Sequence, residues 1–206
     1  LKRVFPELAQ LIGVPQSPKY HPEIDTWLHT KLALDQAANY KYDSEIRFAV
    51  LLHDLGKGLT PKSHWPSHRQ HELIGEEAVH SLCQRLKGPK RYKDLALLVS
   101  KYHLLVHQAT QLKPKTILKL FTQTDAFRRP ERFTQILNAC LCDSKGKKGS
   151  LEKPYHSVGY LQHILSKAKS LNIKELLSTE ICKDNIADLI QHERLKLIKN
   201  CIKNHR

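Results

Sequence analysis

The stretch Arg47-Phe-Ala-Val-Leu-Leu-His53-Asp54-Leu-Gly-Lys57 places a histidine and an aspartate directly after five apolar residues and then breaks at Gly56. Two polar side chains at the end of a buried helix cost free energy unless something pairs with them, and one divalent cation pairs with both. Neighbouring helical residues point about 100° apart, so both can reach one ion only where the helix ends or distorts, which Gly56 permits. The stretch alone fits equally well with a hydrogen-bonded core histidine beside a capping aspartate.

Composition sets the class of protein. Of the 206 residues, 40% are hydrophobic and 26% are charged, which is typical of a globular protein with a sizeable core. The formal net charge of +14 favours a polyanionic partner, nucleic acid before a membrane, although a merely solvated basic surface is the simpler alternative. No apolar run approaches the roughly 18 residues of a membrane span. The five cysteines contain no Cys-x-x-Cys pair, so we expect a reduced, cytoplasmic protein.

Apolar spacing and punctuation predict an all-α fold with almost no strand signal. We expect an opening segment over 1–22 with a short helix at 6–12, a helical domain over 23–150, and a basic helical tail over 151–206. Within these limits the expected helices cover 25–40, 43–54, 70–86, 92–107, 114–127, 130–143, 155–170 and 183–203, with a loop over 56–69. The chain has no methionine, so we expect Leu1 not to be a native start and the chain to be the later part of something longer.

Six polar residues fall on helix faces that the apolar pattern turns inward. In the first long helix, a stripe of Leu28, Leu32, Ala33 and Ala37 takes His29 along its edge. The other five are His53, Asp54, His71, His103 and Asp143. Helical spacing places His71 on the same face as Ile74 and Ala78, and His103 on the same face as Leu95 and Val99. It places Asp143 on the same face as Ile136 and Cys140. A single histidine on such a face is more often a hydrogen-bonded core residue than a ligand. Six histidines and aspartates together favour a divalent metal site.

The order of these residues resembles a known signature. His29, then His53-Asp54, then the distant Asp143 resemble the His…His-Asp…Asp pattern of the HD metal-dependent phosphohydrolase superfamily. The resemblance implies an HD-domain helical bundle in which His29, His53, Asp54 and Asp143 bind the metal. It also implies that His71 and His103 hold a second ion or a phosphate.

Four further motifs narrow the resemblance. His21-Pro-Glu-Ile-Asp-Thr, His53-Asp-Leu-Gly-Lys-Gly, Lys113-Pro-Lys-Thr-Ile and Asp125-Ala-Phe-Arg-Arg-Pro are similar to the C-terminal HD region of bacterial multifunctional CCA-adding enzymes, which are tRNA nucleotidyltransferases. The resemblance covers 1–150 strongly and the tail loosely. It implies 2′,3′-cyclic phosphodiesterase, 2′-nucleotidase and phosphatase activities that use a divalent ion of the nickel, manganese or magnesium class.

The same resemblance implies particular binding partners and an N-terminal nucleotidyltransferase domain that this sequence does not contain. The implied partners are tRNA, nucleotides and 2′,3′-cyclic phosphates, with no membrane, and the protein is expected to be a monomer or a homodimer. Nucleotidyl transfer needs closely spaced carboxylates on strands to hold magnesium, and this chain offers no such strand pair. Transfer is therefore assigned to a missing N-terminal head, of which 1–22 would be the end.

Lysines around the metal ligands suggest how a phosphate is bound. His53, Asp54 and Lys57 are the expected catalytic residues. We also expect Lys57 and Lys145 to bind phosphate, with Lys147 and Lys148 in the same loop as Lys145. Lys145 stands where the family usually has an arginine, and Lys57 is equally suited to be a charge at a helix C-terminus. Two histidines, His68 and His107, rank below the six ligand candidates.

Two other functions fit the sequence. One is a non-catalytic, tRNA-binding tail module whose metal site is vestigial, since the chain is strongly basic. The other is an HD hydrolase that acts on free nucleotides.

Overall fold

A computed structural model describes residues 1–178 and 186–203 and confirms the all-α prediction. Within those residues, the only pairing of strand type is an isolated antiparallel bridge between Pro15 and Asp25. The α-helices are α1 (Pro6–Ala9), α2 (Thr26–Asn39), α3 (Ser44–Leu52), α4 (His71–Arg85), α5 (Lys90–His107), α6 (Pro114–Gln123), α7 (Pro130–Gly146), α8 (Ser157–Lys169), α9 (Ile173–Ser178) and α10 (Ile186–Lys203). Three 3-10 helices are η1 (Leu55–Leu59), η2 (Lys62–His64) and η3 (Ala109–Gln111).

The chain divides into two compact units, each built from two segments. The first unit comprises 1–107 and 134–155, and the second comprises 108–133 and 156–206. The domain limits inferred from the sequence, 1–22, 23–150 and 151–206, remain a prediction.

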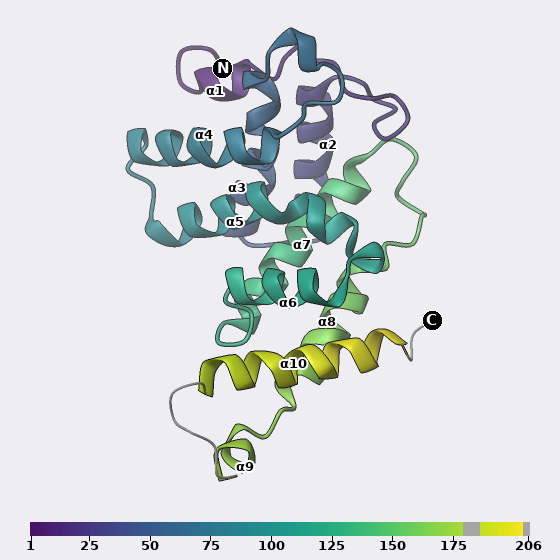
Figure 1. The fold of residues 1–206 in the computed structure, drawn as a ribbon. Helices are drawn as coiled ribbons and strands as arrows, with labels where there is room; N and C mark the ends of the chain where they lie inside the picture. Colours follow the sequence, from purple (N-terminus) through teal and green to yellow (C-terminus); the bar gives the residue numbers. More distant parts are fainter. Residues whose placement is uncertain (179–185, 204–206) are drawn as a thin grey trace. The chain divides into compact units, whose positions relative to one another are not determined.

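In the first unit, α5 packs against both α3 and α4, and α2 packs against α3 (Figure 1). Side-chain caps start two of these helices where the sequence predicts them. Asp25 accepts a hydrogen bond from the amide of Leu28, and Asp43 accepts one from the amide of Ile46. Large aliphatic residues fill the interior, among them Leu52, Leu55, Leu82, Leu95, Ile136 and Leu137. The helices that carry the candidate ligands are therefore anchored by an apolar core.

The buried face of α2 differs from the predicted stripe. Leu28 is 38% exposed, whereas His29, Ala33 and Ala37 are fully buried together with Thr26 and Thr30. The two threonines can be buried because their hydroxyls donate hydrogen bonds to backbone carbonyls. The Thr26 hydroxyl donates to the carbonyl of Val14, and the Thr30 hydroxyl donates to the carbonyl of Thr26. The alanines of the predicted stripe are buried as expected, but the expectation for Leu28 was wrong, and His29 lies at the centre of the face rather than along its edge.

In the second unit, α10 packs against α6 and α8, as Figure 1 shows for the yellow helix. Leu161 and Ile164 of α8 and Ile198 and Ile202 of α10 are buried, so both of these lysine-rich helices are amphipathic. The stretch between the two tail helices contains α9, where no helix was expected from the sequence.

Several helix ends differ from the prediction. α6 ends at Gln123 rather than near 127, because Asp125 adopts a left-handed backbone conformation with φ of 57°. α7 continues three residues past Asp143, to Gly146, whose added Cβ would lie 2.6 Å from backbone atoms of Ala33 in α2. The first residues of the predicted helix 183–203, and Cys182, lie outside the described residues. The other four cysteines are buried free thiols.

Candidate metal centre

The end of α3 brings His53 and Asp54 to one place. His53 keeps helical angles as the cap residue, whereas Asp54 has φ −108° and ψ 13° and leads into η1. The helix therefore ends between the two residues, as the sequence predicts for adjacent side chains that must share a ligand. Gly56 then lies against α4, where an added Cβ would come within 1.9 Å of the His71 carbonyl oxygen.

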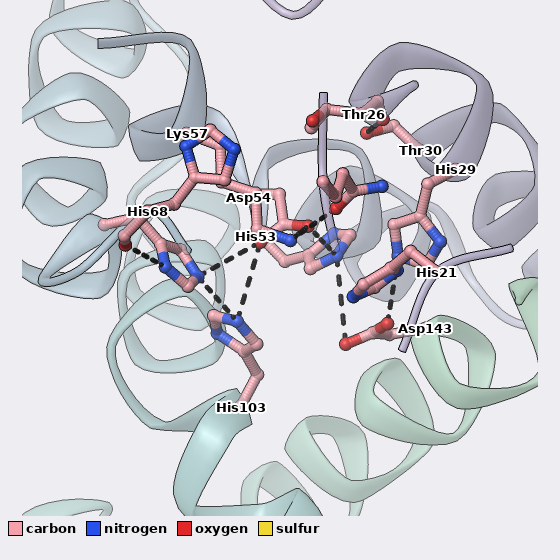
Figure 2. Close-up of polar contacts among 12 residues, drawn as sticks. His21, Thr26, His29, Thr30, His53, Asp54, Lys57, His68, His103 and Asp143 are labelled. Carbon is pink, nitrogen blue, oxygen red and sulfur yellow. Dashed lines mark hydrogen bonds and ion pairs between the residues drawn. The ribbon is translucent and has the colours of Figure 1, made fainter. Parts of the chain in front are cut away.

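Three predicted ligands form a first group. His29 Nε2 lies 3.0 Å from Asp143 Oδ1, and His53 Nε2 lies 3.8 Å from Asp143 Oδ2. All three residues are buried, and their ligand atoms lie within 4.8 Å of one another. They come from α2, α3 and α7, so segments more than 100 residues apart meet here (Figure 2).

Asp54, His71 and His103 form a second buried group. Asp54 Oδ1 lies 3.3 Å from His71 Nε2 and 3.6 Å from His103 Nε2, and the two Nε2 atoms are 3.3 Å apart. The other Asp54 oxygen, Oδ2, lies 3.1 Å from His53 Nε2. The Asp54 carboxylate therefore links the two groups, because Oδ1 faces the histidines of its own group and Oδ2 faces His53 of the first group (Figure 2).

Backbone carbonyls determine which ring nitrogen faces the site. The Nδ1 atoms of His53, His71 and His103 lie 2.7, 2.9 and 2.9 Å from the carbonyls of Val50, His68 and Ser100. A carbonyl only accepts hydrogen bonds, so each Nδ1 carries a proton, and each Nε2 presents a lone pair to the site when the ring is neutral. The lone pairs of His71 and His103 then face each other at 3.3 Å, which is unfavourable unless a cation or a proton lies between them.

The donor set fits a divalent ion. His53 Nε2 and Asp54 Oδ1 are buried and form no hydrogen bond. With metal–ligand bonds of about 2.1 Å, adjacent ligand atoms of an octahedral ion lie about 3 Å apart. The separations of 3.0, 3.1 and 3.3 Å within the cluster are of this size. The residues present therefore match the requirements of one or two bound ions.

Charges inside the cluster shift its pKa values. Burial alone would lower the pKa of His53, but the charges of Asp54 and Asp143 outweigh it and raise the pKa to about 9. Burial lowers the pKa of His103 to about 3. Burial alone would raise the pKa of Asp143, but the positive charges of His107 and Lys147 hold it well below its usual value. Burial would likewise raise the pKa of Asp54, but the positive charges of His53 and Lys57 hold it well below its usual value, so both carboxylates are ionised and can bind a cation.

The predicted phosphate-binding lysines have protein partners in the structure. Lys57 is buried and its Nζ donates to Asp54 Oδ2 and Gln16 Oε1, both at 2.7 Å. A lysine has three donors, so one N–H of Lys57 is left by these two bonds. Lys145 Nζ donates to the carbonyls of Leu151 and Lys153, both at 2.6 Å, and these bonds hold its ammonium group against the loop that follows α7.

Two residues near the ligands received little weight in the sequence analysis. His107 Nε2 lies 2.5 Å from Asp143 Oδ2, and its Nδ1 lies 2.8 Å from the hydroxyl of Tyr155. Its position four residues after His103, on the same helix face, was the available signal. His68, ranked equally low, contacts Thr60 Oγ1 and the Pro15 carbonyl and so stabilises the loop.

Glu23 and His21 also belong to the cluster, although the sequence analysis assigned them no role. Glu23 Oε1 lies 2.8 Å from His29 Nδ1 and 3.1 Å from His21 Nδ1. Both residues precede α2 in an irregular segment, where no periodicity indicates which side chains point inward.

Comparison with known proteins identifies the class. The model of the HD domain family matches residues 26–132, a segment that contains His29, His53, Asp54, His71 and His103 and stops before Asp143. The chain belongs to the HD-domain family, the metal-dependent phosphohydrolase class that the fold and the cluster define.

Within that family the chain corresponds to the HD region of multifunctional CCA proteins. It is 46% identical to the "Multifunctional CCA protein" of Nitrosococcus oceani over all of this chain and 51% of the relative. It is 45% identical to that of Dechloromonas aromatica over 99% of this chain and 50% of the relative, and 42% identical to that of Hahella chejuensis over 97% and 47%. The chain thus spans about half the length of the curated relatives it matches.

No solved structure matches the chain. Among the described residues, no helix is both long enough and apolar enough to cross a membrane.

Proposed function

We propose that the chain hydrolyses phosphoesters with a divalent metal, acting on 2′,3′-cyclic phosphodiesters, 2′-nucleotides and phosphomonoesters in connection with tRNA 3′ ends. The observation that carries the proposal is the set of three Nε2 atoms, of His53, His71 and His103, that backbone carbonyls aim at two buried carboxylates. A bound divalent ion supplies a water of lowered pKa as nucleophile and neutralises phosphoryl oxygens. His29, His53, Asp54 and Asp143 would hold it, with His71 and His103 at a second ion.

The donor set favours some metals over others. Four imidazoles with two carboxylates suit nickel, manganese, iron or zinc better than magnesium, which prefers oxygen ligands and waters. Of the expected nickel, manganese and magnesium class, we therefore favour nickel and manganese for the hydrolase site.

Two lysines are suited to bind the phosphate in this proposal. Lys57 keeps one N–H beyond its bonds to Asp54 and Gln16, and this donor lies next to the ligand cluster. Lys147 is partly exposed, and its charge acts on Asp143 and His21, so it lies on the same side as the first ligand group. A phosphate role for Lys145 remains a prediction and requires its two carbonyl bonds to open.

The test combines elemental analysis with a panel of phosphoesters. After loading with nickel or manganese and gel filtration, the chain is expected to retain one or two equivalents of metal. It should then hydrolyse 2′,3′-cyclic AMP, 2′-AMP and p-nitrophenyl phosphate, and a chelator should abolish the activity. A chain that retains no metal, or a metal-loaded chain that hydrolyses none of these esters, would contradict the proposal.

The strong positive charge supports a second function, the binding of tRNA by a module without its own chemistry. The formal charge of +14 suits contact with phosphate backbones. A metal-loaded chain that binds tRNA and hydrolyses nothing would favour this alternative, and activity confined to free nucleotides would favour an HD hydrolase of nucleotides.

A further inference from the structure

Of the four histidines proposed as metal ligands, His29 is oriented differently from the other three. His53, His71 and His103 each have Nδ1 against a backbone carbonyl, so no side-chain substitution can remove the acceptor. His29 instead has Nδ1 2.8 Å from a carboxylate oxygen of Glu23. This contact does not meet hydrogen-bond geometry, and His29 Nδ1 has no hydrogen-bond partner among the described residues, so Glu23 acts on the ring through its charge at close range.

Glu23 is held firmly in this position. Its side chain is fully buried, and Oε1 also lies 3.1 Å from His21 Nδ1. Its other oxygen, Oε2, accepts a hydrogen bond of 3.2 Å from the backbone amide of Lys148, in the loop after α7. Burial alone would raise the pKa of Glu23, but the close contacts with His21 and His29 hold the pKa well below its usual value. Glu23 therefore presents a fixed negative charge to His29.

The opposite side of the His29 ring has a competing acceptor. His29 Nε2 lies 3.0 Å from Asp143 Oδ1. A neutral imidazole has one proton, so Glu23 and Asp143 compete for it. If the proton is on Nε2, it bonds to Asp143 and removes the lone pair that a metal needs. If the proton is on Nδ1, Nε2 is free to bind an ion.

We propose that Glu23 is a positioning residue that keeps the proton of His29 on Nδ1 and so leaves Nε2 for the metal. The proposal rests on the proposed function only in requiring that the cluster bind a divalent ion. Carboxylates that accept from the distal nitrogen of a ligating histidine fix both the tautomer and the ring orientation, and their loss typically lowers metal affinity about 10- to 100-fold.

The first test needs no substitution. Zinc is diamagnetic, so the zinc-loaded chain with ¹⁵N-labelled histidine is suited to long-range ¹H–¹⁵N NMR. We expect the His29 ring to carry its proton on Nδ1 and to show a metal-bound shift at Nε2. A zinc-loaded chain in which His29 has its proton on Nε2, or binds through Nδ1, would overturn the proposal.

The second test compares zinc affinity among variants by competition with a chelator. Glu23→Gln keeps the size and one acceptor oxygen but loses the charge, and Glu23→Ala loses both. We expect affinity to fall in the order wild type, Glu23→Gln, Glu23→Ala, with a total loss of about 10- to 100-fold. Glu152→Gln is the matched control, since Glu152 is exposed in the loop that follows α7, and its affinity should equal that of the wild type.

The melting temperature separates positioning from a purely structural role. If Glu23 only secures the loop through the Lys148 amide, the metal-free Glu23→Gln chain melts earlier but binds zinc as tightly as the wild type, which would refute the proposal. A wild-type chain that binds no zinc, manganese or nickel would instead refute the proposed function and this inference with it.

Discussion

Replacing Gly56 by alanine tests whether the His-Asp-x-Gly stretch positions the second ligand group. The added Cβ would lie 1.9 Å from the carbonyl oxygen of His71 and 2.6 Å from the amide nitrogen of Gly75, both backbone atoms of α4. Side-chain carbons essentially never approach other atoms closer than 3.0 Å, so η1 and the start of α4 must separate by at least about 1 Å. No rotation of a side chain can relieve this contact.

The expected magnitude follows from that displacement. Overpacking of this kind costs about 1–3 kcal/mol, and each kcal/mol lowers the melting temperature of a chain of this size by roughly 2–4 °C. A ligand displaced by about 1 Å can reduce hydrolysis about 100-fold. Because His71 begins α4, we also expect weaker metal binding, which elemental analysis after gel filtration measures directly.

A matched glycine provides the control. Gly159 lies in α8, where an added Cβ meets nothing within 4 Å, so Gly159→Ala should raise stability by about 0.5–1 kcal/mol through helix propensity and leave hydrolysis unchanged. Thermal melts and hydrolysis of 2′,3′-cyclic AMP decide the outcome. If Gly56→Ala melts, binds metal and turns over like the wild type, the argument that Gly56 sets the distance between η1 and α4 is refuted.

Three further predictions concern pH, Lys57 and tRNA. In the folded, metal-free chain His103 and His21 have pKa values of about 3 and 4, below the 6.5 of the unfolded chain, so the free energy of unfolding should fall as the pH falls from 6.5 toward 3. The raised pKa of His53, about 9, contributes stability below pH 6.5 that is lost as the pH rises toward 9. A free energy of unfolding, measured with urea, that stays constant between pH 4 and 9 would contradict both statements. Lys57→Met should raise KM for a cyclic phosphodiester about tenfold with metal content retained, and an unchanged KM would limit Lys57 to supporting Asp54. The dissociation constant for tRNA should rise at least about tenfold between 50 and 200 mM salt, whereas a salt-independent value would indicate a specific pocket.

Helical periodicity and stop signals were sufficient to predict the all-α class and most helix positions. The Asp25 and Asp43 caps mark their helix starts because the sequence pattern and the capping chemistry coincide. Where backbone geometry decides, the sequence was less informative. The left-handed conformation of Asp125 shortens α6, and no apolar spacing reveals it.

Three of the candidate ligands were predictable because each lies on a helix face that apolar neighbours define. His71, His103 and Asp143 follow this rule, and each is buried in the cluster. His29 was identified as well, although its buried face is built from threonines and alanines rather than from the predicted leucines.

The residues that orient the ligands were harder to predict. Glu23 lies in an irregular segment before α2, and its contact with His29 depends on how that segment turns. Lys145 is a case in which the sequence suggests a role that the structure does not display. A lysine after a ligand aspartate suggests phosphate binding, whereas the Lys145 side chain bonds to the Leu151 and Lys153 carbonyls, in a loop whose conformation the sequence does not specify.

The central claim is that Asp54 holds the metal that hydrolysis needs, and Asp54→Ala tests it most directly. Metal content and hydrolysis of 2′,3′-cyclic AMP are measured together with circular dichroism, and Asp35→Ala in the exposed part of α2 serves as the control. The account predicts that Asp54→Ala retains its helical spectrum, loses bound metal and loses hydrolysis, while the control matches the wild type. Retained metal and turnover in Asp54→Ala, with only a lowered melting temperature, would mean that the His53-Asp54 pair is structural.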